Sequence, residues 1–341
     1  IEGDYIETKQ DNLIFDVKGL LHPNDRKICF IRFYPSPEGD RIKEGKKYKK
    51  IYNLKERYSF LRKKFPQHLF FSNELDLELQ GVKNKNIKRI YAPREYLKKL
   101  TKKEDLSYFE NCSKKLCELF INEGEIPENS IGITGSPMVG LNKDDSDIDL
   151  IIYGTATSIK FQSRLKKILN KSNNCRTYNL KEYKAHYNWR VGGSNILFKD
   201  FLKSEKRKYH QGKFFDFDFF IRYIKSPKDW QGNYYDYKYK NYGRIRLKAE
   251  ILDAIDSIFT PCSYKINVLR VLDKSQTFGK IDKSLLCEID SFRGRFCEQA
   301  IKGEIVLVEG KLEKVNFKDK EKYFRILLSD QIHDKMIPLN T

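Results

Sequence analysis

Short apolar runs broken by turn residues predict a pair of strands near the middle of the chain. Ile131 and Ile133 are typical of a short strand that ends at Gly135 and Ser136. Pro137 suits the first position of a following short helix, because proline's missing N–H would be unpaired there in any case. The pattern therefore predicts a strand, a tight turn and a helix start in succession.

A second strand follows after a polar loop and carries two aspartates. Asp147 and Asp149 flank the apolar Ile148, and the strand continues through the apolar residues 150–152. Residues two apart in a strand project from the same face, roughly 7 Å apart. Both carboxylates are therefore expected on one face, with Ile148 pointing into a core.

Two carboxylates side by side at the end of a buried strand repel each other and are costly to desolvate. A bound divalent cation removes both costs, and Mg²⁺ prefers oxygen ligands. Gly135 lets the backbone approach closely, while the Ser136 hydroxyl and the free N–H groups of a helix start can hold phosphate oxygens. These residue types at this spacing favour a site for a metal ion and phosphate.

The succession Gly135-Ser136, ten residues, then Asp147-Ile148-Asp149 resembles the signature of the DNA polymerase beta-like nucleotidyltransferase superfamily. The resemblance implies transfer of NMP from an NTP to an acceptor hydroxyl. It further implies that the two aspartates bind two Mg²⁺ ions about 4 Å apart, with Mn²⁺ as the alternative ion. Gly135 and Ser136 would hold the β- and γ-phosphates.

A third carboxylate is expected on a later strand, because members of the superfamily usually have one there. Residues 214–224 alternate aromatic and acidic side chains, which predicts one strand with Asp216 and Asp218 on the same face. Asp218 fits the third metal-binding and catalytic position better, since an apolar run follows it directly. Asp216 stays open as the alternative.

A cation to balance the triphosphate is expected near these acids. Arg222 is favoured slightly because it lies four residues beyond Asp218, hence on the same strand face. Arg164, Lys167 and Arg190 are the other candidates. The resemblance also implies that Asp218 binds the metal ion nearer the acceptor and helps to deprotonate the acceptor hydroxyl.

The predicted fold class is α+β, with three domains. Residues 1–100 form a basic α+β module, residues 101–228 the catalytic domain, and residues 229–341 a β-rich, barrel-like module. The resemblance implies a mixed catalytic sheet with helices on one side. Beyond the catalytic domain the arrangement resembles that of uncharacterised archaeal-type nucleotidyltransferases, which indicates no substrate.

Periodicity predicts the flanking elements. Helices are expected over 54–65, 105–123 (capped by Asp105 and stopped by Gly124), 155–169, 181–189 and 195–209. Strands are expected over 13–17, 28–34, 244–252, 257–260, 265–272, 286–289, 305–312 and 323–328, with residues 234–243 as a linker.

Charge points to a polyanionic partner. Lys and Arg number 66 against 47 acids, a formal charge of +19, although a thermophile's lysine-rich surface would look similar. The run 41–64 interleaves cations with Tyr48, Tyr52, Tyr58 and Phe60, which could follow a phosphate backbone and stack bases. A solvated helix face with its apolar side in a core is the first interpretation of that run.

The cysteines, histidines and apolar runs narrow the kinds of protein that the sequence is compatible with. Seven scattered cysteines and five separate histidines do not support a zinc site or Ser-His-Asp chemistry, and predict reduced thiols in a cytoplasmic protein. No apolar run approaches the ~20 residues of a membrane span. The favoured function is a metal-dependent nucleotidyltransferase acting on nucleic acid, with RNA preferred. Alternatives are a protein or small-molecule acceptor, or an inactive nucleic-acid-binding protein.

Overall fold

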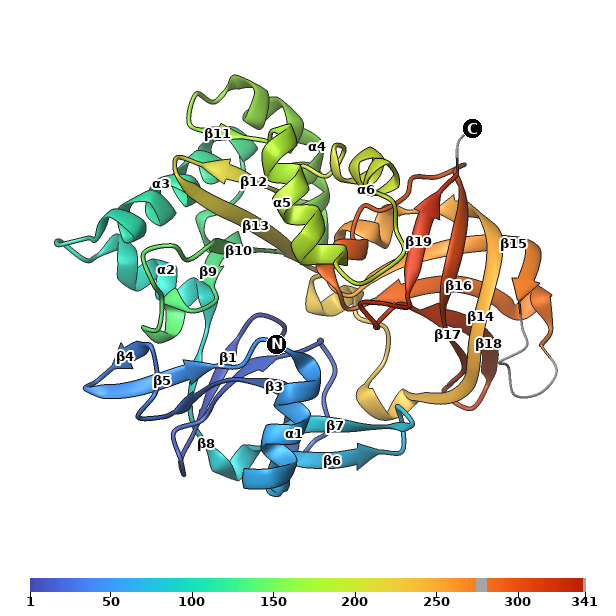
Figure 1. Ribbon diagram of the computed structural model, residues 1–341, viewed down its shortest axis with the longest axis horizontal. Helices are drawn as coiled ribbons and strands as arrows, with labels where there is room; N and C mark the ends of the chain where they lie inside the picture. The colour runs from blue at the N-terminus through green and yellow to red at the C-terminus, as the bar shows by residue number, and fades with distance from the viewer. Residues whose placement is uncertain (274–280, 340–341) are drawn as a thin grey trace. The chain divides into compact units, whose positions relative to one another are not determined.

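The computed structural model describes residues 1–273 and 281–339, and the chain forms two compact units that mix helices and sheets (Figure 1). The mixed α+β class is therefore confirmed, while the three predicted domains stay a prediction. The first unit comprises Ile1–Asn73, Leu77–Arg176 and His210–Tyr234; the second comprises Glu74–Asp76, Thr177–Tyr209 and Tyr235–Thr341.

The first unit begins with an antiparallel sheet whose strand order is β4-β5-β3-β2-β1-β8, with β7 also paired to β3 and β6 to β7. Its strands are β1 (Tyr5–Thr8), β2 (Ile14–Val17), β3 (Arg26–Pro35), β4 (Arg41–Lys43), β5 (Lys46–Lys50), β6 (Leu69–Ser72), β7 (Leu77–Lys83) and β8 (Ile87–Tyr91). Helix α1 (Leu54–Lys64) begins where the Asn53 side chain accepts two backbone N–H bonds. Leu61 of α1 packs into the apolar core on one face of this N-terminal sheet.

The other face of the N-terminal sheet packs against the turn that follows Ser136. One buried cluster joins side chains of β1, β2, β3 and β5 to those just beyond the turn: Tyr5, Ile14, Phe33 and Tyr48 with Met138, Val139 and Leu141. The N-terminal sheet and the predicted phosphate-binding turn therefore share a core.

A second sheet in this unit has the order β11-β12-β13-β10-β9, and β10 and β13 run parallel. Its strands are β9 (Ile131–Thr134), β10 (Ile148–Tyr153), β11 (Cys175–Arg176), β12 (Gln211–Phe214) and β13 (Phe217–Ile224). Helices α3 (Tyr108–Gly124) and α4 (Thr155–Lys171) cover one face, where the Phe120 ring lies 5.2 Å from Phe161 and 5.8 Å from Phe219. Helix α2 (Pro93–Thr101) packs on β9.

Two predictions in this unit were wrong in detail. Helix α3 is capped by Ser107 rather than Asp105, because Ser107 and Glu110 exchange side-chain and backbone hydrogen bonds as a capping box. Gly124 is the last helical residue and not the stop. A Cβ there would lie 2.5 Å from the Phe161 ring, so glycine allows α3 and α4 to pack closely.

The expected single strand over 214–224 is a hairpin. Phe215 has φ +49 and ends the alternation, so β12 stops at Phe214 and β13 starts at Phe217. Asp216 therefore lies in the turn and not on a strand face.

In the second unit the described strands form a closed sheet. The strand order is β14-β15-β16-β18-β17, and pairing of β17 with β14 closes the sheet. Strands β16 and β18 run parallel, and β19 pairs with β17. These strands are β14 (Tyr237–Asp253), β15 (Cys262–Asp273), β16 (Leu286–Ser291), β17 (Ile305–Phe317), β18 (Glu321–Leu327) and β19 (Lys335–Pro338), in orange to red in Figure 1. Helices α5 (Leu180–Val191) and α6 (Phe198–Glu205) belong to the same unit, and Phe201 packs with Ile337 of β19.

Three further predictions need correction. Most of the expected linker 234–243 belongs to β14, since its Tyr-Lys alternation has the period of a strand and pairs with β17. The expected strand 257–260 is a short 3₁₀ turn, Ile255–Ile258, begun by the Asp253 side chain accepting from the Ile255 N–H. The expected helix 195–209 is limited to α6. No helix in the described part of the chain has the length and apolarity to cross a membrane.

Candidate active site

The three predicted metal-binding aspartates lie on one face of the parallel strands β10 and β13. Ile148 of β10 pairs with Phe219 of β13. Asp147 and Asp218 each precede one of these residues, so they lie side by side where the two strands begin to pair. Asp149 follows on the same face, opposite the side that α3 and α4 cover. Asp216 in the hairpin turn instead accepts a 3.3 Å hydrogen bond from the Tyr108 hydroxyl.

Gly135 lies against the Asp149 carboxylate. Its φ of +87° is strained for any residue with a side chain, and a Cβ would lie 2.9 Å from Asp149 Oδ2. Ser136 then begins a 3₁₀ turn with Pro137 at its first position, and its carbonyl accepts from the Leu141 N–H at 3.0 Å. The half-buried Ser136 hydroxyl has no hydrogen-bond partner within the described residues.

The two signature carboxylates carry uncompensated charge. Surrounding protein limits the hydration of Asp147 although it is exposed on one side, and this effect, followed by the charges of Asp149 and Asp218, raises its pKa to about 7. Burial likewise raises the pKa of Asp149, despite the opposing influence of nearby cations. Neither carboxylate forms a hydrogen bond or ion pair with residues that the structure describes.

The donor set fits a hard divalent cation. Within residues 1–273 and 281–339 no three His, Cys, Asp or Glu side chains are already gathered closely enough to hold a metal. Asp218 forms an ion pair with Lys213, with Oδ2 and Nζ 2.9 Å apart. Three carboxylates facing one way nevertheless supply the oxygen ligands that Mg²⁺ prefers.

Cations from the N-terminal sheet face these acids. Lys50, at the end of β5, is half-buried and has no ion pair among the described residues. Burial, then repulsion by Arg32 and Arg41, lowers its pKa to about 8, while Asp149 and Asp147 oppose that shift. The Nε atoms of both arginines are buried and lack hydrogen-bond partners among the described residues. Buried donors are usually satisfied, so an anion or water is expected there.

Sequence reasoning did not single out these three cations. The basic run 41–64 contains Arg41 and Lys50, but only the pairing of Lys50 with Phe33 across β3 and β5 turns its side chain toward the acids. Arg32 comes before that run, and no sequence signal marked it.

Arg222, favoured from the sequence, lies on the same face but is already engaged. Its guanidinium donates to Glu2 at 2.9 Å. Burial disfavours its charge, yet Glu2, Asp16 and Asp149 outweigh this effect and raise its pKa. The Thr134 hydroxyl, on β9, donates to the Gly3 carbonyl at 2.6 Å and so holds the same N-terminal segment against the second sheet. Arg222 therefore ties the chain's first residues to the acid face.

The other predicted cations lie elsewhere. Arg164 pairs with Glu125 at 2.6 Å and stands on α4, which covers the opposite face of the sheet. Lys167 is exposed on the same helix, and Arg190 belongs to the second unit.

An uncharacterized protein of Methanocaldococcus jannaschii is 28% identical over 335 residues, which is 95% of this chain and 94% of that protein. No family model and no solved structure matches the chain.

Proposed function

We propose that the protein is a metal-dependent nucleotidyltransferase that transfers NMP from an NTP to an acceptor hydroxyl on nucleic acid, with RNA favoured. The observation that carries the proposal is the placement of Asp147, Asp149 and Asp218 on one face of β10 and β13, with the Gly135 turn against them. Crowded carboxylates without partners are neutralised either by a proton or by a bound cation, and such sites are frequently functional.

The three aspartates are the residues that would hold Mg²⁺. The bound ions would neutralise phosphate charge and make the acceptor hydroxyl easier to deprotonate. Asp147 and Asp149, which lack ion pairs among the described residues, are available as ligands without breaking existing contacts. Asp218 would exchange its contact with Lys213 for this role.

Residues around the acids would bind the polyphosphate. The Ser136 hydroxyl, free of partners in the described chain, would donate to a phosphate oxygen. Lys50 and the unsatisfied Nε of Arg32 add positive charge on the opposing N-terminal sheet. The phosphates would thus lie between a hydroxyl donor on one side and cations on the other.

The transfer itself exchanges two P–O bonds. The acceptor oxygen forms a bond with the α-phosphorus, and the bond from the α-phosphorus to the oxygen bridging to the β-phosphate breaks, releasing pyrophosphate. The proton of the acceptor hydroxyl would pass to the Asp218 carboxylate, whose side chain is 41% exposed and so open to an incoming acceptor.

Two features support nucleic acid as the acceptor. The net charge of +19 favours a polyanion. The second unit contains a closed sheet of five described strands, and small barrels of that kind are common platforms for single-stranded nucleic acid. Fold alone does not establish this function, so the acceptor must be tested directly.

Incubation with α-³²P-labelled NTPs, Mg²⁺ and total RNA tests the proposal. Label is expected on RNA with the parent protein and is expected to be lost with EDTA. Label on protein or on a small molecule would move the assignment to another acceptor class. Absence of transfer to every acceptor, together with absence of NTP binding, would contradict the nucleotidyltransferase assignment.

A further inference from the structure

Tyr52 is the exposed aromatic residue of the basic run in the N-terminal sheet. Tyr48 is buried, and Phe60 packs in the core beneath α1. Tyr58 donates its hydroxyl to the Glu78 carbonyl at 3.0 Å. The Tyr52 side chain, by contrast, is 67% exposed. Three of the four aromatics thus serve the fold, and the fourth has no packing role that explains it.

The backbone that presents Tyr52 is held rigidly. The buried Arg57 donates to the carbonyl oxygens of both Ile51 and Tyr52 at 3.1 Å. Asn53, the next residue, caps helix α1. Because this backbone is already fixed, little backbone freedom is lost when a flat ligand stacks on the ring, which favours binding.

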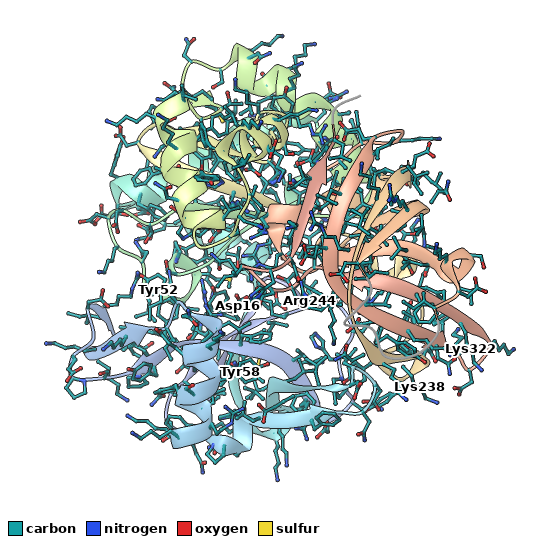
Figure 2. All side chains as sticks on the ribbon, turned by 45° about the vertical axis from the view of Figure 1, so that its right-hand side comes forward. Asp16, Tyr52, Tyr58, Lys238, Arg244 and Lys322 are labelled. Atoms are coloured by element: carbon teal, nitrogen blue, oxygen red, sulfur yellow. The ribbon has the colours of Figure 1, made fainter. Side chains whose placement is uncertain are left out.

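Lys50 connects this ring to the acid site. Its Nζ lies 4.7 Å from the centroid of the Tyr52 ring, and its charge interacts with Asp149 and Asp147. Figure 2 shows Tyr52 and Asp16 at about the same height in the N-terminal sheet, with Tyr58 below them. The Lys50 ammonium group therefore contacts the aromatic ring and also interacts with the charges of the two acids.

This combination of groups matches the parts of a nucleoside triphosphate. We propose that Tyr52 stacks on the base of the NTP while Lys50 contacts its phosphates, so that the N-terminal sheet supplies the nucleotide subsite. This inference rests on the proposed function and assigns its substrate-binding residues. Stacking tolerates every base, because each has a π face, and it strengthens with the larger ring system of purines. Purine triphosphates are therefore the expected preferred substrates.

Calorimetric titration of the full chain with Mg²⁺-ATP, with Mg²⁺-tripolyphosphate and with a short oligoadenylate separates the contributions. Tyr52→Ala is expected to weaken ATP binding about fivefold or more while tripolyphosphate binding stays unchanged. Lys50→Met is expected to weaken both ligands. Lys49→Met is the matched control, since Lys49 is the preceding residue on β5, faces the other way and pairs with Glu38.

Tyr52→Trp supplies a readout that does not depend on activity. Its added fluorescence, measured as the difference from the parent protein, should be quenched by ATP and not by tripolyphosphate. Tyr52→Phe should bind ATP as the parent does, because it keeps the ring.

The outcomes are distinct. Unchanged ATP binding in Tyr52→Ala overturns the inference while leaving the proposed function intact. Loss of oligoadenylate binding alone assigns the ring to the acceptor and also overturns it. If the parent protein binds neither ATP nor tripolyphosphate, the proposed function itself fails.

Discussion

Acidic side chains are treated in opposite ways on the closed sheet and helix α6 of the second unit and on the β10–β13 face of the first unit. In the second unit, Glu313 is 1% exposed and accepts hydrogen bonds of 2.8–2.9 Å from Arg325 and 2.7 Å from Lys311. Glu205 pairs with the buried Lys208 at 2.6 Å. In the first unit, Asp147 and Asp149 have no such partner among the described residues.

The pKa values follow this difference. Burial favours the neutral form of Glu205, yet the Lys208 charge and the hydrogen bond from His186 outweigh it and hold its pKa well below the usual range. The pKa of Asp147 is instead raised to about 7. Acids with a structural role are neutralised within the chain, whereas the uncompensated acids are those expected to await a ligand.

Asp149→Asn should produce the largest functional change. Removing one metal-binding carboxylate is expected to lower label transfer at least 10²–10³-fold. The melting temperature should be unchanged or higher, because the substitution removes an unpaired charge. Asp216→Asn, in the hairpin turn, is the control and should retain transfer. Transfer by Asp149→Asn at the parent rate would count decisively against the site.

Arg325→Met should have the largest effect on stability. It leaves the buried Glu313 carboxylate without its main partner, so the free energy of unfolding is expected to fall by about 3–5 kcal/mol. Urea unfolding followed by circular dichroism measures this change. Arg325 also pairs with Asp290 at 2.9 Å, so the triple variant Glu313→Gln, Asp290→Asn, Arg325→Met should recover most of the loss; failure to do so would mean that packing of Arg325, not charge, is responsible.

Gly135→Ala should act on both stability and transfer. The strained φ is expected to cost about 1–2 kcal/mol, and the added methyl also displaces Asp149. Gly45→Ala separates the two effects, since Gly45 has φ +74° but no neighbour within 4 Å of the added atom. Equal loss of transfer in both variants would show that the contact with Asp149 is unimportant.

The two kinds of acid should give opposite pH dependence of stability. Burial opposes the charge of Glu7, but Lys88, Tyr91 and Lys43 lower its pKa to about 2, so its contribution is lost as pH falls from about 4.5 toward 2. Asp147, with a raised pKa, binds a proton more readily when folded, so its contribution decreases as pH rises from about 4 to 7. Melting temperatures measured in EDTA as a function of pH check this. Glu7→Gln should lack the loss of stability at low pH, and Asp147→Asn should lack the loss of stability between about pH 4 and 7.

Addition of Mg²⁺ should give the smallest of these effects, a small rise in melting temperature. Binding at about tenfold excess over Kd is expected to raise the melting temperature of the parent protein by about 1–3 °C. Asp149→Asn should not respond, while Arg325→Met should, from its lower starting temperature. An equal response in the parent and in Asp149→Asn would locate the ion elsewhere.

Local pattern was sufficient for much of the fold. The helices near 54–65, 155–169 and 181–189 were predicted, and their structural counterparts are α1, α4 and α5. For 54–65 the signal was the helical spacing of its apolar residues. The strands of the signature followed from their alternation. The hairpin at Phe215 and the long strand β14 were missed, because a positive φ and a distant pairing partner leave little local signal.

The candidates for chemistry could be recognised from residue types and spacing alone: Gly135, Ser136, Asp147, Asp149 and Asp218 stand at spacings typical of one strand face or turn. The folded chain was needed to show that Asp218 rather than Asp216 lies beside Asp147, and that Lys50 and Arg32 face the acids while Arg222 binds Glu2. The physical reason is that strand register and the packing of one sheet on another join residues far apart in the chain, and neither quantity is encoded within a local window.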